Sequence, residues 1–331
     1  MMNKRLKQGT TFLLALALAF PLLTLPGARA ANAIETDRKC SVSFSVSGEG
    51  NELTAADTDI KVNLYKVADV DVSGNYTATK DFTGLNVSSV SADDKDAAAS
   101  EWADRAKEAQ KMLKESVEPT ATVTLAKGIG SKDGLATGLY LVDTPEVVTT
   151  NYTYTFTPYL VSLPTNNYYS NGNDTWIYDL TDTNAVGLKP EEHARYGDLK
   201  INKRLANHNA TTGKKATFVF QIEITPLKGK TETRIESLDF EAAGDSSVTI
   251  TKIPAGATVK VTEVYSGASY KLISENDQTT KIIATDEKGA PVSVSFTNDI
   301  DNNMNGGYGI RNNFKLDEND QYQYTKPAAK N

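Results

Sequence analysis

Residues 197–203 (GDLKINK) and residues 292–298 (VSVSFTN) frame the second half of the chain and decide how it folds. Alternating apolar and polar residues in such short runs predict half-buried β-strands. Between them, residues 258–264 (TVKVTEV) predict a third strand, in which Glu263 stands among apolar positions. The three segments predict a sandwich that carries Lys203, Glu263 and Asn298 on three of its strands.

The stretch from residue 196 to residue 300 contains seven such runs, the number of strands in an immunoglobulin-like sandwich. We expect strands at residues 199–203, 216–224, 247–250, 258–264, 270–273, 281–284 and 292–297. The tail, residues 301–331, is expected to add one hairpin or edge strand from residues 308–310 and 314–316 before a loose end.

Residues 31–195 predict a first domain of the same kind. We expect its strands at residues 41–46, 60–67, 120–125, 138–142, 153–163 and 176–180. Residues 187–197, with Pro190 and a pair of glutamates, read as the linker between the domains. The predicted fold is therefore all-β, with two immunoglobulin-like antiparallel sandwiches in tandem.

One segment of the first domain has a different period. Between about residues 92 and 115, apolar side chains follow helical spacing with charged residues between them. They are Trp102, Ala106, Ala109 and Leu113. We therefore expect a helix inserted between the strands and packed on their sheet.

Residues 1–30 have the order of a secretory signal peptide. Basic residues come first, an apolar run follows at residues 12–25, and Ala28-Arg29-Ala30 provides a cleavage site. We expect export and removal of this segment, because the apolar run is too short to span a bilayer comfortably. No second apolar stretch follows, so no membrane span is expected in the mature chain.

Charge and cysteine content restrict the partners and the sources of stability. The net charge is −7 and becomes more negative when the basic residues of the signal peptide are removed. An acidic surface argues against nucleic acid and anionic membranes as partners. Cys40 is the single cysteine, so an exported chain without an internal disulfide must be stabilised by its core or by another crosslink.

The common enzyme motifs are absent from the sequence: there is no HExxH, GxSxG, P-loop or GxGxxG pattern. Only His193, His208 and Cys40 supply nitrogen or sulfur ligands, which leaves little material for a metal site. We read both histidines as loop residues near the linker. The sequence therefore predicts no turnover enzyme, no metal and no cofactor.

Lys203, Glu263 and Asn298 are the ingredients of a spontaneous Lys-Asn isopeptide bond. Burial between two sheets would lower the pKa of the Lys203 amine. A protonated Glu263 would then polarise the Asn298 carbonyl and carry a proton to the departing ammonia. The alternative is that all three lie on the surface, with Glu263 paired to Lys252 or Lys260 and Asn298 starting a turn.

The strand register decides between these interpretations, because a shift of one residue exchanges the inward and outward faces of a strand. Asn312 and Asn313 are fallback partners for Lys203, should the tail supply the final strand.

Five segments of the second domain follow one another in a familiar order: residues 199–205, 218–220, 248–257, 261–263 and 296–298. In this order the domain resembles the CnaB-like, isopeptide-forming domains of Gram-positive backbone pilins, in the variant called the pilin isopeptide linkage domain. The resemblance implies that Lys203 and Asn298 form the crosslink and that Glu263 is the assisting acid.

The first domain resembles the N-terminal domain of the same pilins through residues 60–69, 138–142, 159–164 and 176–179. In sortase-assembled pilins, a lysine shortly after the tryptophan strand is joined to the next subunit. By position, Lys189 is the candidate for this intersubunit linkage, although the spacing here is longer than the usual motif.

A crosslink in the first domain has fewer residues to support it. The resemblance places a catalytic acid at Asp143, and Lys61 or Lys66 would supply the amine. No closing asparagine stands out in this domain.

The resemblance implies a structural pilus subunit at the surface of a Gram-positive bacterium, with other pilin subunits as partners and a sortase as the assembling enzyme. The alternative is a secreted or tip-located adhesin that binds a host or matrix ligand through the tyrosines of residues 151–169. The sequence lacks the LPxTG-like motif, apolar helix and basic tail of such pilins. Retention through a partner, secretion and a longer chain all stay open.

Overall fold

The computed structural model describes residues 23–24, 33–46, 52–55, 58–91, 95–166, 175–181, 185–209, 215–267, 269–285, 289–301, 313–316 and 322–325. The predicted signal peptide apart from residues 23–24, the predicted strand at 308–310 and Asn312 lie outside these ranges. The chain divides into two compact units. Unit 1 comprises Met1–Thr149 and Tyr154–Glu192, and unit 2 comprises Thr150–Thr153 and His193–Asn331.

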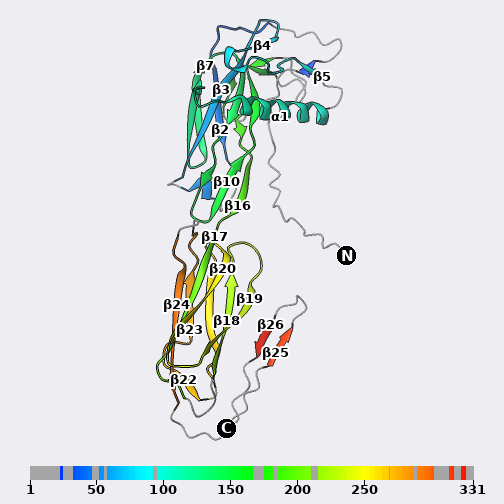
Figure 1. Ribbon diagram of the computed structural model, residues 1–331. Coiled ribbons are helices and arrows are strands. Elements are labelled where there is room, and N and C mark those ends of the chain that lie inside the picture. The colour runs from blue at the N-terminus through cyan, green and yellow to red at the C-terminus, as the bar shows by residue number, and fades with distance from the viewer. Residues whose placement is uncertain are drawn as a thin grey trace. The chain divides into compact units, whose positions relative to one another are not determined.

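Both units consist mainly of β-strands, and unit 1 also contains an α-helix (Figure 1). The predicted fold class, all-β with immunoglobulin-like sandwiches and a helix in the first of them, is confirmed.

The elements between residues 23 and 194 are mostly short strands. They are β1 (Leu23–Thr24), β2 (Cys40–Ser45), η1 (Glu52–Thr54), β3 (Asp59–Val70), β4 (Tyr76–Ala78), η2 (Lys80–Phe82), β5 (Val90–Ser91), α1 (Lys95–Met112), β6 (Ala121–Ala126), β7 (Ile129–Leu135), β8 (Gly138–Asp143), β9 (Val147–Val148), β10 (Tyr152–Phe156), β11 (Tyr159–Leu163), β12 (Thr165–Asn166), β13 (Trp176–Ile177), β14 (Asp179–Leu180), β15 (Val186–Gly187) and β16 (Pro190–Ala194). Nine of the strands form one sheet in the order β11-β8-β3-β6-β7-β2-β14, with β4 beside β3 and β15 beside β2. Smaller sheets pair β1 with β5, β12 with β13, and β10 with β9 and β16.

Helix α1 covers part of the nine-stranded sheet, as its sequence pattern predicts. Trp102, Ala106 and Ala109 are buried in one apolar cluster with Leu141 of β8 and Leu160 of β11. These three residues follow one another at intervals of three and four, which places them on one face of a helix. The burial of this face holds α1 against β8 and β11.

Unit 2 contains two separate four-stranded sheets. Its elements are β17 (Tyr196–Leu205), β18 (Ala216–Thr225), β19 (Glu232–Phe240), β20 (Gly244–Pro254), β21 (Thr258–Tyr265), β22 (Tyr270–Leu272), β23 (Asp277–Lys281), β24 (Val292–Ile300), β25 (Asn313–Leu316) and β26 (Tyr322–Thr325). The sheets have the orders β20-β17-β24-β22 and β19-β18-β21-β23, and β25 and β26 form a hairpin of their own.

Three details of unit 2 differ from the prediction. Strand β19 was not predicted, because most of its residues are only partly buried and its apolar alternation is weak. Strand β23 consists of polar residues 277–281, whereas a strand was predicted at residues 281–284, where Lys281 precedes three apolar residues. The predicted antiparallel pattern also has an exception, since β17 and β24 are parallel neighbours.

Alternation along the strands determines which side chains enter the core of unit 2. On β17, Leu199, Ile201, Lys203 and Leu205 are buried between the sheets, while the residues between them face outward. The parallel pairing sets Lys203 opposite Phe296 of β24. A lysine therefore occupies a position that the pattern of the strand gives to an apolar residue.

Candidate functional site

The structure brings Lys203, Glu263 and Asn298 together in the core of unit 2. They come from β17, β21 and β24, so both sheets contribute. Their exposed fractions are 1%, 4% and 0%. The alternative interpretation, in which they are surface residues, does not agree with this burial.

Hydrogen bonds join the three side chains in a closed ring. The Lys203 Nζ donates to Glu263 Oε2 and to Asn298 Oδ1. The Asn298 Nδ2 donates to Glu263 Oε1 over 2.6 Å. The carboxyl group of Glu263 therefore contacts both nitrogen atoms, one through each oxygen.

Aromatic rings enclose the amine. The Lys203 Nζ lies 4.4 Å from the ring centre of Phe218 and 5.7 Å from that of Phe220. The ring of Phe220 in turn lies 5.2 Å from that of Phe296. Phe218 and Phe220 were not predicted as site residues, although their spacing of two along β18 places both on the same, inward face.

Burial lowers the pKa of the Lys203 amine below its usual value of 10.5, and the charge and hydrogen bond of Glu263 oppose that shift. The desolvation effect is the larger of the two, because removing water penalises the charged form. The neutral, nucleophilic amine is therefore easier to reach here than on the surface.

One contact differs from the expected geometry. Glu263 was predicted to contact the carbonyl oxygen of Asn298, whereas its carboxyl group accepts a hydrogen bond from the amide nitrogen Nδ2. That nitrogen is the atom that would leave as ammonia. The arrangement places one carboxyl group between the amine that must lose a proton and the nitrogen that must gain one.

The lysines suggested as surface partners of Glu263 lie elsewhere. Lys260 forms an ion pair with Asp277, 3.1 Å between Nζ and Oδ2. Lys252 is exposed and its backbone nitrogen donates to Asp198. Asn298 is the amide that the structure places against Lys203, and the backbone of the fallback partner Asn313 pairs with Thr325 in the hairpin of β25 and β26.

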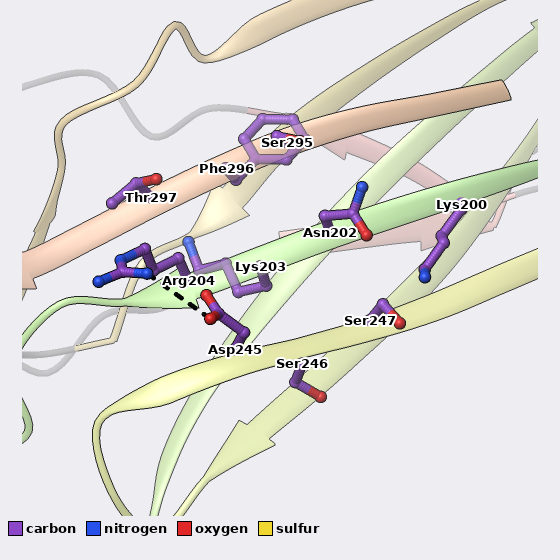
Figure 2. A pocket seen from close by; sticks show the side chains of 10 residues that line it. All are labelled: Lys200, Asn202, Lys203, Arg204, Asp245, Ser246, Ser247, Ser295, Phe296 and Thr297. Atoms are coloured by element: carbon purple, nitrogen blue, oxygen red, sulfur yellow. Dashed lines mark ion pairs between the residues drawn. The ribbon is translucent and has the colours of Figure 1, made fainter.

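The sheet β20-β17-β24-β22, which carries Lys203 and Asn298, has a polar outer face. A depression of about 480 Å³ lies there, lined by side chains of β17, β20 and β24 (Figure 2). Asn202 and Arg204 stand on either side of Lys203 along β17, and Arg204 forms an exposed ion pair with Asp245 at 3.6 Å. Two adjacent basic residues of β17 thus have opposite environments: Lys203 is buried between the sheets and Arg204 is exposed to solvent.

The candidate linkage residue Lys189 lies between β15 and β16 in unit 1. Its side chain is exposed, and its carbonyl oxygen accepts a hydrogen bond from the Thr157 nitrogen at 3.4 Å. A partner could therefore reach its amine.

The candidate acid of the first domain, Asp143, contacts a helix and not a lysine. Its Oδ1 accepts a 2.6 Å hydrogen bond from Gln110 Nε2 of α1. Lys66 pairs with Asp69 on its own strand at 2.5 Å, and Lys61 is exposed. The structure therefore does not gather a second set of amine, acid and amide from these residues.

The tyrosines proposed as a binding surface are partly covered. Tyr154 is buried, and its hydroxyl donates to Glu192 at 3.2 Å. Tyr152 and Tyr159 are half-buried. The described tyrosines of this segment therefore belong largely to the β-structure itself.

Cys40 and the histidines also have defined surroundings. Cys40 is fully buried in β2, and burial raises the pKa of its thiol to about 11. His193 is exposed in β16, so the prediction that it lies in a loop was wrong, whereas His208 does lie outside the strands, with its ring 6.5 Å from that of Tyr270. Within the described ranges, no group of three or more His, Cys, Asp or Glu side chains is placed to hold a metal ion. Among the residues that the structure describes, no helix is long and apolar enough to cross a bilayer.

A family model matches residues 199–301, and the family is described as a domain of unknown function (DUF5979). The match begins in β17 and ends just after β24, so it includes Lys203, Glu263 and Asn298. No protein of curated function matches the sequence.

Several solved structures are similar to this chain at low identity. The Bacillus anthracis TIE protein is 13% identical with a TM-score of 0.31, and the match covers 79% of this chain and 34% of that one, so this chain spans about a third of its length. GBS52, the minor pilin of Streptococcus agalactiae, is 13% identical over 82% of this chain and 100% of its own, with a TM-score of 0.25. The major pilin SpaA of Corynebacterium diphtheriae is 11% identical over 78% of this chain and 100% of its own, with a TM-score of 0.22. Gram-positive pilins are thus among the structures that this chain resembles, and identities this low do not say which of its residues react.

Proposed function

We propose that unit 2 forms an intramolecular isopeptide bond between Lys203 and Asn298, assisted by Glu263. The observation that carries the proposal is the buried ring of hydrogen bonds among the amine, the carboxyl group and the amide. Reactive groups held in contact by a folded framework gain roughly 7 to 11 kcal/mol over groups that must meet in solution.

The reaction needs no reagent beyond the chain itself. Glu263 accepts a proton from the Lys203 amine through Oε2, and the neutral Nζ attacks the side-chain carbonyl carbon of Asn298. The bond from Nζ to that carbon forms, and the bond from the carbon to Nδ2 breaks. Glu263 delivers that proton to Nδ2 through Oε1, and ammonia leaves. The regenerated carboxylate then takes the second proton from Nζ, so a neutral secondary amide and a protonated Glu263 remain.

The product would stabilise unit 2 by closing a long loop. Lys203 and Asn298 are 95 residues apart in the sequence. In the chain-entropy model used for disulfides, a loop of that length contributes about 4 to 5 kcal/mol. Such a crosslink would provide the covalent link between distant parts of the chain that a single cysteine cannot provide as an internal disulfide.

We further propose that the chain is an extracellular structural subunit of a pilus or similar fibre, and that it performs one self-modification without turnover of a substrate. The acidic composition, the predicted export signal and the resemblance to backbone pilins support this role. The exposed Lys189 is the candidate residue for linkage to the next subunit, with a sortase as the candidate enzyme. The partners would be other pilin subunits, and the location the bacterial surface.

Intact mass tests the crosslink. The purified wild-type chain is expected to be lighter than its calculated mass by one ammonia, about 17 Da. A Glu263→Gln variant keeps the shape of the side chain but cannot accept the proton, so it should have its full calculated mass. The exposed Glu241 provides the matched control, and Glu241→Gln should lose ammonia like the wild type. Full mass in the wild type would contradict the crosslink.

Assembly is tested in the bacterium that makes the protein. Ladders of high molecular mass that survive boiling in detergent are expected in the wild type and should disappear in Lys189→Ala. The exposed Lys132 on β7 is the control, because its replacement should leave the ladders intact. A chain that never forms ladders but binds glycans or matrix protein would contradict the fibre and favour the adhesin.

A further inference from the structure

Residues 273–278 carry the chain of unit 2 from one sheet to the other. Residues 273–276 join β22, in the sheet of Asn298, to β23, in the sheet of Glu263, and residues 277–278 are the first two of β23 itself. We call them the crossover segment. Alternate side chains of this segment, Ser274, Asn276 and Gln278, bind the backbone of the strands that carry the site residues.

The crossover segment hydrogen-bonds the edge of β24 beyond the residues that pair with β22. Strand β22 pairs with β24 only over residues 298–300. Just before that, the Gln278 amide bonds both backbone groups of Ser295: Nε2 donates to its oxygen at 2.5 Å, and Oε1 accepts from its nitrogen at 3.0 Å. The nitrogen of Thr297 donates to Ser274 Oγ at 3.1 Å, and its oxygen accepts from the Ile273 nitrogen at 2.9 Å. Side chains thus complete the edge of β24 next to Asn298.

On the side of β21, the same segment binds the acid's own backbone. Strand β23 pairs with β21 over residues 258–262, so the nitrogen of Glu263 lies just beyond the paired region. That nitrogen donates to Asn276 Oδ1 at 3.0 Å. On this edge of β21 a side chain therefore makes the bond that the strand ladder no longer supplies, while the opposite edge pairs with β18.

We propose that Asn276 and Gln278 are positioning residues for isopeptide formation: the crossover segment holds β21 and β24, which belong to opposite sheets, in the register that makes Glu263 and Asn298 face each other. The inference rests on the proposed crosslink. Neither residue bonds a side chain of the reactive set, so both act through the backbone. The physical reason is that a slip of one residue would turn Asn298 outward, and that the reaction depends on near-contact geometry.

The experiment follows crosslinking in newly made protein. The full chain is synthesised in a cell-free translation with a short labelled pulse, and the fraction that lacks about 17 Da is measured by intact mass during the chase. Asn276→Ala should slow the loss of ammonia roughly two- to tenfold, the range that corresponds to one net hydrogen bond. Gln278→Ala removes both bonds to Ser295 and should slow it at least as much. The variants should still reach the crosslinked end state.

Conservative variants separate positioning from general destabilisation. Asn276→Asp keeps an oxygen acceptor for the Glu263 nitrogen and should restore the rate to within about twofold of the wild type. Thr279→Ala changes an exposed residue of β23 and should have no effect. The same variants in a Lys203→Met background, which cannot crosslink, should remain folded by urea titration, so that a slower rate is not explained by unfolded protein.

The outcomes are distinguishable. If the wild type loses ammonia and both alanine variants do so at the same rate, the positioning role is wrong while the crosslink stands. A slower rate that Asn276→Asp does not restore, or that matches a loss of folded protein in the Lys203→Met background, also overturns the positioning role. If the wild type itself never loses ammonia, the crosslink and the positioning role fall together.

Discussion

Unit 1 joins nine strands in one hydrogen-bonded sheet and lays a helix on it, whereas unit 2 divides eight strands between two separate sheets. Each unit places an acid near the end of a central strand. Asp143 in unit 1 is half-buried and accepts a hydrogen bond from the neutral Gln110 of the helix. Glu263 in unit 2 is buried against an amine and an amide.

The difference shows that the acid alone does not make a reactive site. An amide donor from a helix gives Asp143 an ordinary structural hydrogen bond. In contrast, Glu263 meets both nitrogens of a prospective condensation in a space that excludes water. Burial and the choice of partner therefore separate a structural carboxylate from one that can transfer protons.

The largest expected effect is on the stability of unit 2 when the Lys203-Asn298 crosslink cannot form, with no change in unit 1. Lys203→Met removes the amine but keeps an apolar side chain of similar length, and should lower the free energy of unfolding of unit 2 by about 4 to 5 kcal/mol. Both tryptophans, Trp102 and Trp176, lie in unit 1. Tryptophan fluorescence in denaturant should therefore report an unchanged unit 1, while circular dichroism shows an earlier transition for unit 2. If the circular-dichroism unfolding curves of Lys203→Met and the wild type coincide, unit 2 is not stabilised by a crosslink at Lys203 and does not differ from unit 1 in this respect.

The converse change should affect unit 1 alone. Trp102→Ala empties a position in the cluster beneath α1 where the side chain is 3% exposed, and such truncations cost about 3 to 5 kcal/mol. Trp176 remains as the fluorescent reporter. Ser100→Ala, on the exposed face of the helix, serves as the control and should change stability by less than about 0.5 kcal/mol. An unchanged transition of unit 1 in Trp102→Ala would mean that the helix contributes little to that core.

A smaller effect concerns pH, and it should occur only in unit 2. Asn298→Ala prevents the crosslink but retains the buried lysine, whose pKa is lowered in the folded state from 10.5. Between the folded pKa and 10.5, the unfolded chain binds more protons, so the stability of unit 2 should rise with pH through that window. Below the folded pKa the full penalty of burying the charge is present. Urea titrations across alkaline pH test this, and adding Lys203→Met should abolish the slope. A slope that persists without the lysine would assign it to another group.

The smallest effect is expected one residue further along β17. Arg204→Ala removes an exposed ion pair with Asp245, and such pairs contribute about 0 to 1 kcal/mol. The mass deficit of one ammonia should persist in this variant. If Arg204→Ala abolished the deficit, the outer face of the sheet would have a part in the reaction that its exposure does not suggest.

The strands that carry the site could be predicted because their side chains alternate. Strands β17, β21 and β24 each show that alternation, and so does the apolar face of α1. The orientation of Lys203 could not be predicted, since it depends on a register of one residue that the neighbouring strands determine. The sequence also could not predict that Glu263 contacts Nδ2 of Asn298. The oxygen and the nitrogen of the amide belong to one side chain, so only the structure shows which of them faces the acid.

The roles of Asn276 and Gln278 were hidden for a different reason. They lie in a polar segment that reads as a turn, and their importance comes from which backbone groups the neighbouring strands leave unpaired. Strand β19 was missed because partial exposure of both faces removes the apolar alternation. Sequence patterns thus report burial well and pairing partners poorly.

The parallel pairing of β17 with β24 has a consequence for length under load. Lys203 and Asn298 both lie close to the carboxyl ends of these strands. A bond between them would exclude almost all of the intervening 95-residue separation from any force applied across the unit. Without the bond, unfolding could release roughly 310 to 340 Å of chain at about 3.3 to 3.6 Å per residue. With it, the extension of unit 2 under tension would be confined to the residues outside the crosslinked loop, 193–202 and 299–331.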